Sequence, residues 1–568
     1  MTHPLPTSPD EIVRMQWAQC EPVVAELTAR ALTPDNVQQW LLDWTHLTEA
    51  IGEQYARLQV ATTVNTIDAE AEKRFIAFMD ETYPKFMAAN EQLKKKLLAS
   101  GLEPEGFAIP LRNFKAESDL FRAENLPLLA DEQKLGIEYD KIVGAQTVEW
   151  EGQELTVPQM QPFYQHPSRE VREKAWRLVA DRQLADRTAI NNLWQRFLTL
   201  RLKIAANAGR PDYRAYRWQE LLRFDYTPED SLRFDAAIEE VVVPAAARLY
   251  ERRRQQLGVD TLRPWDLEVD LLGRPALRPF DSVDELITGS SNIFHLVHPT
   301  LGAHFDTMVM EDLLDLENRK HKAPGAYCTS FDTIRRPFIF SNAVGLHDDV
   351  QTLLHEAGHA FHVFESARLP LSPQLNVPME FAEVASMSME YLGMPYLGKA
   401  AGGFYSPQDV ARAEIEHIER SLAFWPYMAV VDSFQHWVYT NPEAAADPNR
   451  CDSQWGQLWQ RFMPGIDYRG LEDVMVTGWH RKLHIHRLPF YYVEYGLAQL
   501  GAVQVWGNSL KNPIDAVADY RFALSLGGTV TLPNLFQAAG ARLAFDAKTL
   551  QAAVNLMETT LDQLREVQ

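Results

Sequence analysis

The sequence predicts a mainly α-helical fold that carries a small β-sheet, and three observations support this fold class. Apolar residues recur every three or four positions over most of the chain, which is the spacing of an amphipathic helix. Alternation of apolar and polar residues, typical of strands, is confined to two short regions, near 146–158 and 326–342. A chain of 568 residues also exceeds what one simple core fills, so we expect more than one packed subdomain.

Helical spacing covers the ranges 10–30, 35–65 and 68–99 in turn. The alternation near 146–158 crosses Gly152 and predicts a β-hairpin. Helical spacing resumes after Pro167, which predicts an N-terminal helical lobe at 1–165 and a second lobe at 166–568. The region 326–342 predicts two strands, and helical spacing follows at 345–400, 408–440 and 490–507.

Charge and cysteine usage exclude several classes of protein. The net charge of -22, from 55 basic and 77 acidic side chains, argues against nucleic acid and anionic membranes as partners. Three widely separated cysteines form neither a disulfide framework nor a cysteine-zinc cluster. The sequence shows no signal-peptide pattern and no apolar run of about 18 residues. We therefore expect a cytoplasmic protein.

The pentapeptide His355-Glu356-Ala357-Gly358-His359 predicts a metal site. Two histidines four residues apart on a helix project from one face at the separation that zinc requires. Glu356 lies beside the first histidine, where a carboxylate can take a proton from water at the metal. Gly358 inside the helix costs about 1 kcal/mol relative to alanine, so the sequence indicates a packing or access reason for it.

A catalytic zinc takes a third protein ligand. A histidine six residues after His359 would be one solution, but Glu365 occupies that position. The following segment, 378–390, has helical spacing and offers Glu380, Glu383 and Glu390. Periodicity alone does not choose among these three glutamates.

The pentapeptide, followed 24 residues later by Glu383 within Phe381-Ala382-Glu383-Val384-Ala385-Ser386, resembles the thimet oligopeptidase and oligoendopeptidase F family. Segments 223–230 and 325–327 and a tyrosine-rich segment after residue 484 resemble the oligoendopeptidase F branch, and the similarity runs from about residue 140 to the C-terminus. The resemblance implies one Zn²⁺ held by His355, His359 and Glu383, with Glu356 as general base. It also implies a two-lobed helical metallopeptidase with a deep channel and a small β-sheet beside the zinc-binding helix.

The tyrosine-rich segment supplies donors for the oxyanion of peptide hydrolysis. Tyr492 and Tyr495 lie three residues apart, so a helix directs both hydroxyls to one side. The resemblance assigns His484, Tyr492 and Tyr495, with Tyr495 as the main oxyanion donor. His480 or His486 remains an alternative to His484, and Tyr491 an alternative to Tyr492.

We therefore expect a zinc-dependent endopeptidase that hydrolyses internal bonds of short peptides. The edge of the strands at 326–342 would bind an extended peptide through backbone hydrogen bonds. A carboxypeptidase or dipeptidyl carboxypeptidase on the same scaffold is the rival activity, and it requires a cation for the terminal carboxylate. The candidates for this cation are Arg335, Arg336, Arg481 and Lys482. A non-catalytic peptide-binding protein is the second rival, against which the intact Glu356 argues.

Overall fold

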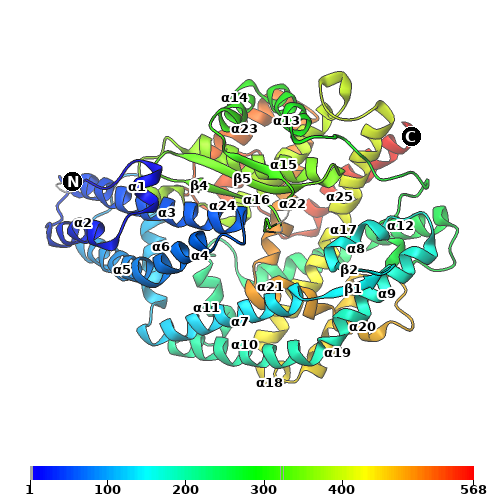
Figure 1. Ribbon diagram of the computed structural model, residues 1–568, viewed down its shortest axis with the longest axis horizontal. Coiled ribbons are helices and arrows are strands. Elements are labelled where there is room, and N and C mark those ends of the chain that lie inside the picture. The colour runs from blue at the N-terminus through cyan, green and yellow to red at the C-terminus, as the bar shows by residue number, and fades with distance from the viewer. Residues whose placement is uncertain (1–3, 320, 324, 568) are drawn as a thin grey trace. The chain divides into compact units, whose positions relative to one another are not determined.

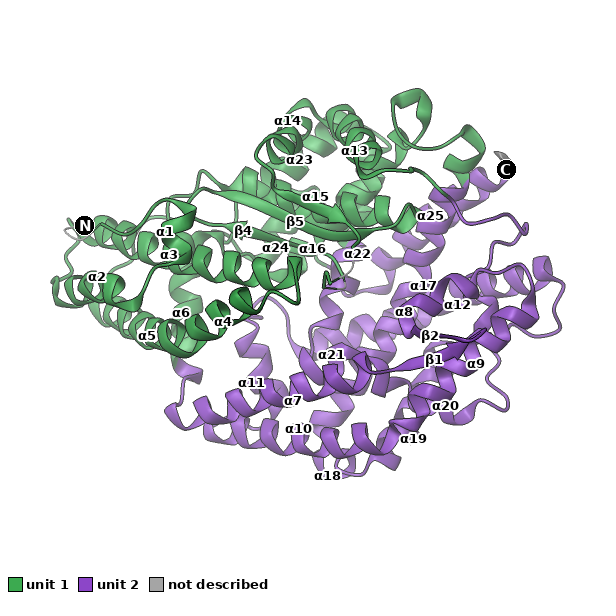
Figure 2. Ribbon diagram, viewed as in Figure 1, with its two compact units in different colours: residues 1–118, 278–411, 501–543 green, residues 119–277, 412–500, 544–568 purple. Residues whose placement is uncertain are grey.

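The computed structural model describes residues 4–319, 321–323 and 325–567, which form two compact units (Figure 1, Figure 2). Unit 1 consists of Met1–Ser118, Arg278–Ala411 and Gly501–Leu543, and unit 2 consists of Asp119–Leu277, Arg412–Leu500 and Ala544–Gln568. Both are built mainly of helices with short strands, which confirms the predicted fold class. The predicted lobes 1–165 and 166–568 are contiguous, whereas each unit combines three separate segments, and the lobe boundary stays a prediction.

Helices at the start of unit 1 occupy the three ranges that helical spacing predicts. Their apolar faces enclose a core that includes the buried Trp40, Trp44 and Leu47. The helix of the third predicted range ends where Gly101 adopts the left-handed conformation, with φ 66°. The helices are α1 (Pro9–Val13), α2 (Trp17–Ala29), α3 (Val37–Val64), α4 (Ala69–Ala77), α5 (Tyr83–Ser100) and α6 (Ala108–Leu120), the last of which crosses the unit boundary.

The sheet of unit 1 has three strands in the order β3-β5-β4. Strands β4 (Tyr327–Phe331) and β5 (Arg336–Ala343) pair antiparallel, as the alternation over 326–342 predicts. Strand β3 (Leu314–Glu317) pairs parallel with β5 and lies outside the two regions of predicted strand. Because β5 is the central strand, β4 forms one edge of the sheet.

Helix α15 (His347–Ser366) follows β5 and packs against the sheet and against α16 (Met379–Gly393), an arrangement visible in Figure 1. The start of α15 is fixed by the Asp349 carboxylate, which accepts hydrogen bonds from the backbone N–H groups of Val344 and Leu346, both at 2.8 Å. The other helices of unit 1 are α13 (Val283–Val297), α14 (Pro299–Met310), α23 (Pro513–Ser525) and α24 (Leu532–Ala538).

Gly358 permits the close contact between α15 and α16. A Cβ at this position would lie 2.5 Å from the Cα of Ser386 and 2.6 Å from the carbonyl oxygen of Ala385. Both atoms belong to the backbone of α16, so neither moves aside as a flexible side chain would. This is the packing reason that the sequence left open for the glycine.

Unit 2 contains the predicted hairpin, in which β1 (Thr147–Trp150) pairs antiparallel with β2 (Gln153–Thr156). Its remaining elements are helices that include the predicted ranges 408–440 and 490–507. They are α7 (Leu126–Gly144), α8 (Val157–Tyr164), α9 (Arg169–Ala185), α10 (Arg187–Asn207), α11 (Tyr213–Glu220), α12 (Pro228–Leu257), α17 (Pro407–Thr440), α18 (Pro442–Ala445), α19 (Pro448–Phe462), α20 (Glu472–Val476), α21 (Leu483–Arg487), α22 (Tyr492–Ser509) and α25 (Ala547–Val567), of which α17 and α22 extend across a unit boundary.

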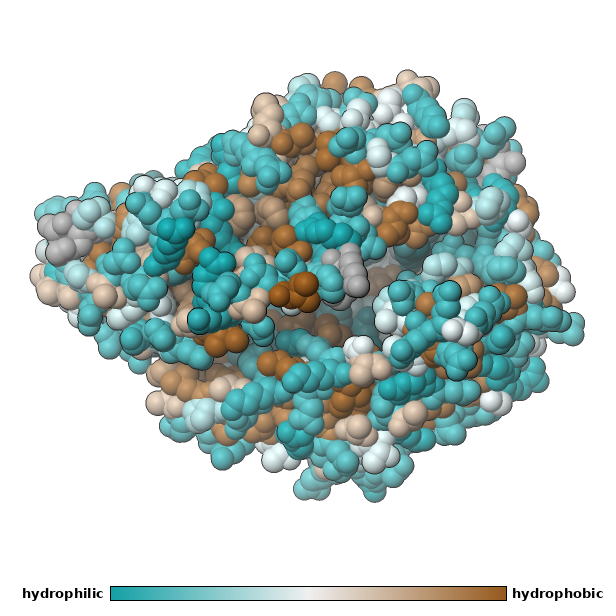
Figure 3. All heavy atoms as spheres, in the orientation of Figure 1, coloured by the Kyte–Doolittle hydropathy of each residue, from teal (hydrophilic) through white to brown (hydrophobic). Residues whose placement is uncertain are grey.

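Hydrophilic side chains cover most of the face that Figure 3 shows, in keeping with the net charge of -22. Among the described residues, every helix is either too short or too polar to cross a lipid bilayer.

Candidate metal centre

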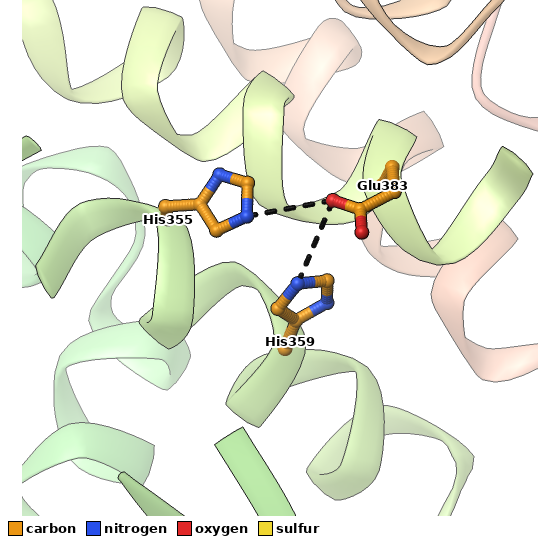
Figure 4. A group of neighbouring side chains, drawn as sticks. All are labelled: His355, His359 and Glu383. Carbon is orange, nitrogen blue, oxygen red and sulfur yellow. Dashed lines mark ion pairs between the residues drawn. The ribbon is translucent and has the colours of Figure 1, made fainter. Parts of the chain in front are cut away.

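His355, His359 and Glu383 come together where α15 packs against α16 (Figure 4). The Nε2 atoms of His355 and His359 lie 3.4 Å and 3.7 Å from Glu383 Oε2. One ligand atom from each of the three side chains lies within 4.8 Å of the other two. Within the described part of the chain this is the group of histidine, cysteine and acidic side chains that meets this criterion. Two imidazoles and one carboxylate are the donor set of a catalytic zinc site, so the residues fit this ion.

The two remaining glutamates of α16 occupy different places. The Nδ1 atom of His355 lies 2.7 Å from Glu390 Oε1, so Glu390 accepts a hydrogen bond on the side of the ring opposite the cluster. This bond leaves Nε2 of His355 directed at Glu383, as expected for a ligand whose tautomer is set by a carboxylate. Glu380 is buried on the first turn of α16 and is not a member of the cluster. The geometry therefore separates three glutamates that periodicity left equivalent.

Glu383 is held by its own helix as well as by the histidines. The hydroxyl of Ser386 donates a hydrogen bond of 3.0 Å to Glu383 Oε2. Burial raises the pKa of Glu383, but the hydrogen bond from His355 and the charges of His359 and His355 outweigh it and lower the pKa to about 2. Burial lowers the pKa of His359 to about 4. The carboxylate is thus ionised and the His359 ring neutral near pH 7, the forms that bind a metal.

Glu356 is buried, with 8% of its surface exposed, next to His355 on α15. The backbone N–H of Cys328, on the edge strand β4, donates a hydrogen bond to its carboxylate. Burial is the main cause that raises the pKa of Glu356 to about 7, and the carboxylates of Glu383 and Glu390 act in the same direction. The edge strand therefore holds the carboxylate of the pentapeptide in place.

His484, Tyr492 and Tyr495 form a second group, which belongs to unit 2. The His484 ring lies 4.9 Å from that of Tyr492 and 5.9 Å from that of Tyr495, and the two tyrosine rings are 5.7 Å apart. Tyr491 joins the same group, with its ring 5.3 Å from that of Tyr495. The structure therefore brings together all the predicted members and does not distinguish Tyr491 from Tyr492.

The two alternative histidines lie in other surroundings. His480 is buried and its Nε2 lies 2.8 Å from the side-chain oxygen of Asn191. His486 is fully buried and its ring stacks on that of Tyr139, with centroids 4.4 Å apart. Of the three histidines in question, His484 is the one whose ring lies against the tyrosines.

The four cations considered for a terminal carboxylate divide into two pairs. Arg335 is ion-paired with Glu49, and Arg336 is ion-paired with Glu311 at 2.7 Å. Arg481 and Lys482 form no ion pair with any described carboxylate. The sequence alone does not distinguish these four cations, and only the positions of their side chains do.

Comparisons with known proteins show which family the chain is similar to. Residues 163–555 match the model of peptidase family M3, and residues 8–105 match the peptidase M3 N-terminal domain. The oligoendopeptidase F homolog of Borreliella burgdorferi is 22% identical over 333 residues, which cover 57% of this chain and 54% of that protein. The oligopeptidase PepF of Bacillus subtilis is 23% identical over 337 residues, which cover 57% and 47%. The chain thus spans about half the length of these curated relatives.

Solved structures extend the likeness to the whole chain. PZ peptidase A, solved with an inhibitor, superposes with a TM-score of 0.88 at 28% identity, covering 100% of this chain and 99% of that one. Oligoendopeptidase-F from Enterococcus faecium shares the fold with a TM-score of 0.64 at 15% identity, covering 99% of each chain. The family model alone covers more than half of the sequence, and it includes the pentapeptide, Glu383 and the tyrosine segment, so the chain belongs to peptidase family M3.

Proposed function

We propose that the protein is a zinc-dependent endopeptidase that hydrolyses internal bonds of short peptides. The observation that carries the proposal is the cluster of His355, His359 and Glu383, with Glu356 adjacent on the same helix. His355, His359 and Glu383 would hold one Zn²⁺. A zinc ion in such a site supplies a Lewis acid, which polarises a carbonyl group and increases the acidity of water.

The side chains of the protein carry the proton transfers. Glu356 accepts a proton from the attacking water as its oxygen bonds to the scissile carbonyl carbon. It then delivers this proton to the amide nitrogen as the C–N bond breaks, so the products are a carboxylate and a free amine. The Cys328 N–H orients the Glu356 carboxylate during both transfers.

Tyr495, together with His484 or Tyr492, donates a hydrogen bond to the oxygen that becomes negatively charged. The removal of one such donor typically slows hydrolysis by roughly 10²- to 10³-fold. Strand β4 would align the substrate, because among the described residues its outer edge pairs with no further strand and can pair with an extended backbone. Pairing of this kind depends little on side chains, which fits a peptidase that acts on varied short peptides.

The Glu356→Gln substitution tests the proposal. We expect hydrolysis of a quenched nine-residue peptide to fall by at least roughly 10³-fold while zinc content and thermal melting are retained, because glutamine is isosteric but accepts no proton. Glu365→Gln, on the same helix outside the cluster, is the matched control and should keep its activity. If Glu356→Gln kept most of its activity, the general-base role would be wrong.

The position of the cleaved bond separates the endopeptidase from its rival. The endopeptidase cuts internal bonds of peptides that are acetylated at the N-terminus and amidated at the C-terminus, and mass spectrometry identifies the products. Release of single residues or dipeptides, confined to peptides with a free C-terminus, would instead favour the carboxypeptidase activity.

A further inference from the structure

Two adjacent cations in unit 2, Arg481 and Lys482, have no acidic partner among the described residues. The protein has a net charge of -22, so carboxylates outnumber basic groups. Arg253 of the same unit, like Arg481, donates hydrogen bonds to backbone carbonyls. Four arginines of the unit with buried side chains are instead ion-paired. These pairs are Arg172–Asp266 at 3.1 Å, Arg201–Glu132 at 2.7 Å, Arg223–Glu494 at 2.7 Å and Arg412–Asp270 at 3.2 Å.

Aromatic rings surround both cations in place of carboxylates. The ammonium of Lys482 lies 3.9 Å from the centre of the Tyr492 ring and 5.2 Å from that of Tyr427. The guanidinium of Arg481 lies near the phenols of Tyr427, Tyr468 and Tyr139 and donates one hydrogen bond, of 3.0 Å, to the Val474 carbonyl. Tyr427 is therefore the neighbour that the two cations share.

The tyrosine hydroxyls beside the two cations are further hydrogen-bond donors. The hydroxyls of Tyr427 and Tyr468 have no hydrogen-bond partner within the described part of the chain. Burial raises the pKa of Tyr427 to about 12 and also raises that of Tyr468, so both phenols stay protonated donors near pH 7. Burial likewise lowers the pKa of Arg481, and that of Lys482 to about 8, because no carboxylate stabilises their charges. A bound anion would accept hydrogen bonds from these hydroxyls and from the two cations.

We propose that Arg481, Lys482 and the hydroxyls of Tyr427 and Tyr468 form an anion site that binds a carboxylate of the peptide substrate, the C-terminal one in particular. The inference rests on the proposed function, because Lys482 contacts Tyr492, a member of the group proposed to meet the substrate. The forked guanidinium matches the two oxygens of a carboxylate, and the ammonium adds a second charge. The preferred substrates of the proposed endopeptidase are therefore short peptides with a free C-terminus, although amidated peptides are also cleaved.

Matched peptides test the site. One quenched sequence is made in lengths of roughly five to thirteen residues, each with a free C-terminal carboxylate and as the amide. We expect kcat/KM of the wild-type protein to favour the carboxylate form by about tenfold or more at the best length, since a charge-assisted hydrogen bond contributes about 1.5–3 kcal/mol. Equal kcat/KM for the two forms at every length would overturn the proposal.

Substitutions at Arg481, Lys482 and Tyr427 test whether these residues cause the preference for the carboxylate peptide. Lys482→Met and Arg481→Met should each lower kcat/KM for the carboxylate peptide by about tenfold and leave the amide peptide within about twofold, which removes the preference. Lys134→Met is the control, because Lys134 lies on the surface of the same unit and pairs with Asp131. Tyr427→Phe removes one donor, keeps the ring and should show a smaller loss of the same kind. An equal loss for both peptides would mean a structural role and overturn the proposal.

Binding separates this inference from the proposed function. Calorimetric titration of the Glu356→Gln protein with both peptide forms measures carboxylate recognition without turnover. Tighter binding of the carboxylate form, lost in the Glu356→Gln/Lys482→Met double variant, supports the anion site even if the wild-type protein hydrolyses neither peptide. That result would contradict the proposed peptidase activity and still support the anion site. Equal binding of the two forms overturns the anion site whatever the activity.

Discussion

Arg223 forms a buried ion pair with Glu494, the residue that lies between Tyr492 and Tyr495 in the chain. The guanidinium is 2.7 Å from Glu494 Oε1, and the same nitrogen donates a hydrogen bond of 2.6 Å to the carbonyl of Phe490. Phe490 adopts φ 63°, a left-handed conformation that costs a non-glycine residue about 1–2 kcal/mol. Arg223 thus anchors both ends of the turn that leads into α22 and its tyrosines.

We expect Arg223→Met and Glu494→Gln each to lower kcat for peptide hydrolysis by about tenfold or more. Loss of either partner breaks a buried ion pair, which costs about 3–5 kcal/mol, and it releases the segment that carries the tyrosines. A double-mutant cycle on kcat/KM and on urea denaturation measures the coupling, and the double variant should lose less than the sum of the two singles. Arg233→Met, which removes an exposed arginine paired with Asp230, is the control. Additive losses would contradict the anchoring role.

Glu390→Gln should weaken zinc binding by about 10- to 100-fold. Glu390 contacts His355 rather than the proposed ion, so its contribution is to orient the ring and increase its basicity. Competition with a fluorescent chelator gives the Kd for zinc, and activity restored by excess zinc would show that the catalytic groups are intact. Glu311→Gln, which alters a surface ion pair with Arg336, should leave the Kd unchanged. An unchanged Kd for Glu390→Gln would remove Glu390 from the metal centre.

Gly358→Ala should destabilise unit 1 and weaken zinc binding, although alanine is the better helix former. The added methyl group meets the backbone of α16 at 2.5 Å, and overpacking of this kind costs about 1–3 kcal/mol. Gly144→Ala is the matched control, because a Cβ at Gly144, the last residue of α7, meets nothing within 4 Å. Thermal melting and zinc content report both effects. A melting temperature for Gly358→Ala as high as that of the control would show that α16 shifts to accommodate the methyl group without loss of stability.

Periodicity predicts most of the fold because helix contacts are local. The ranges 10–30, 35–65 and 68–99 each appear as helices within a few residues of the expected bounds. Strand β3 was missed because it has four residues and owes its conformation to pairing with β5, some 25 positions further along the chain. The match of residues 8–105 to the family's N-terminal domain was also missed, since those helices carry no chemical motif.

In the candidate site, too, spacing within one helix can be predicted from the sequence, whereas contacts between distant segments cannot. Spacing places His355, Glu356 and His359 on one helix, and this alone predicts three of the four residues of the centre. The choice among Glu380, Glu383 and Glu390 depends on how α16 faces α15, which no spacing rule contains. The positions of His480 and His486 against Asn191 and Tyr139 likewise depend on contacts between distant segments.

Glu414 predicts a pH dependence of stability that is independent of the metal centre. Burial alone raises the pKa of this carboxyl from its reference value of 4.5 to about 7. Because the folded state binds the proton more tightly than the unfolded state, the stabilisation is fully present below about pH 4.5 and is lost as the pH rises through 7. Glu414→Gln should therefore melt at the same temperature as the wild-type protein near pH 4.5 and roughly 1–3 °C higher above pH 8. Glu240→Gln, at an exposed position of α12, should show no such crossover. A melting difference for Glu414→Gln that stayed constant between pH 4.5 and 8.5 would show that Glu414 titrates alike in the folded and unfolded states.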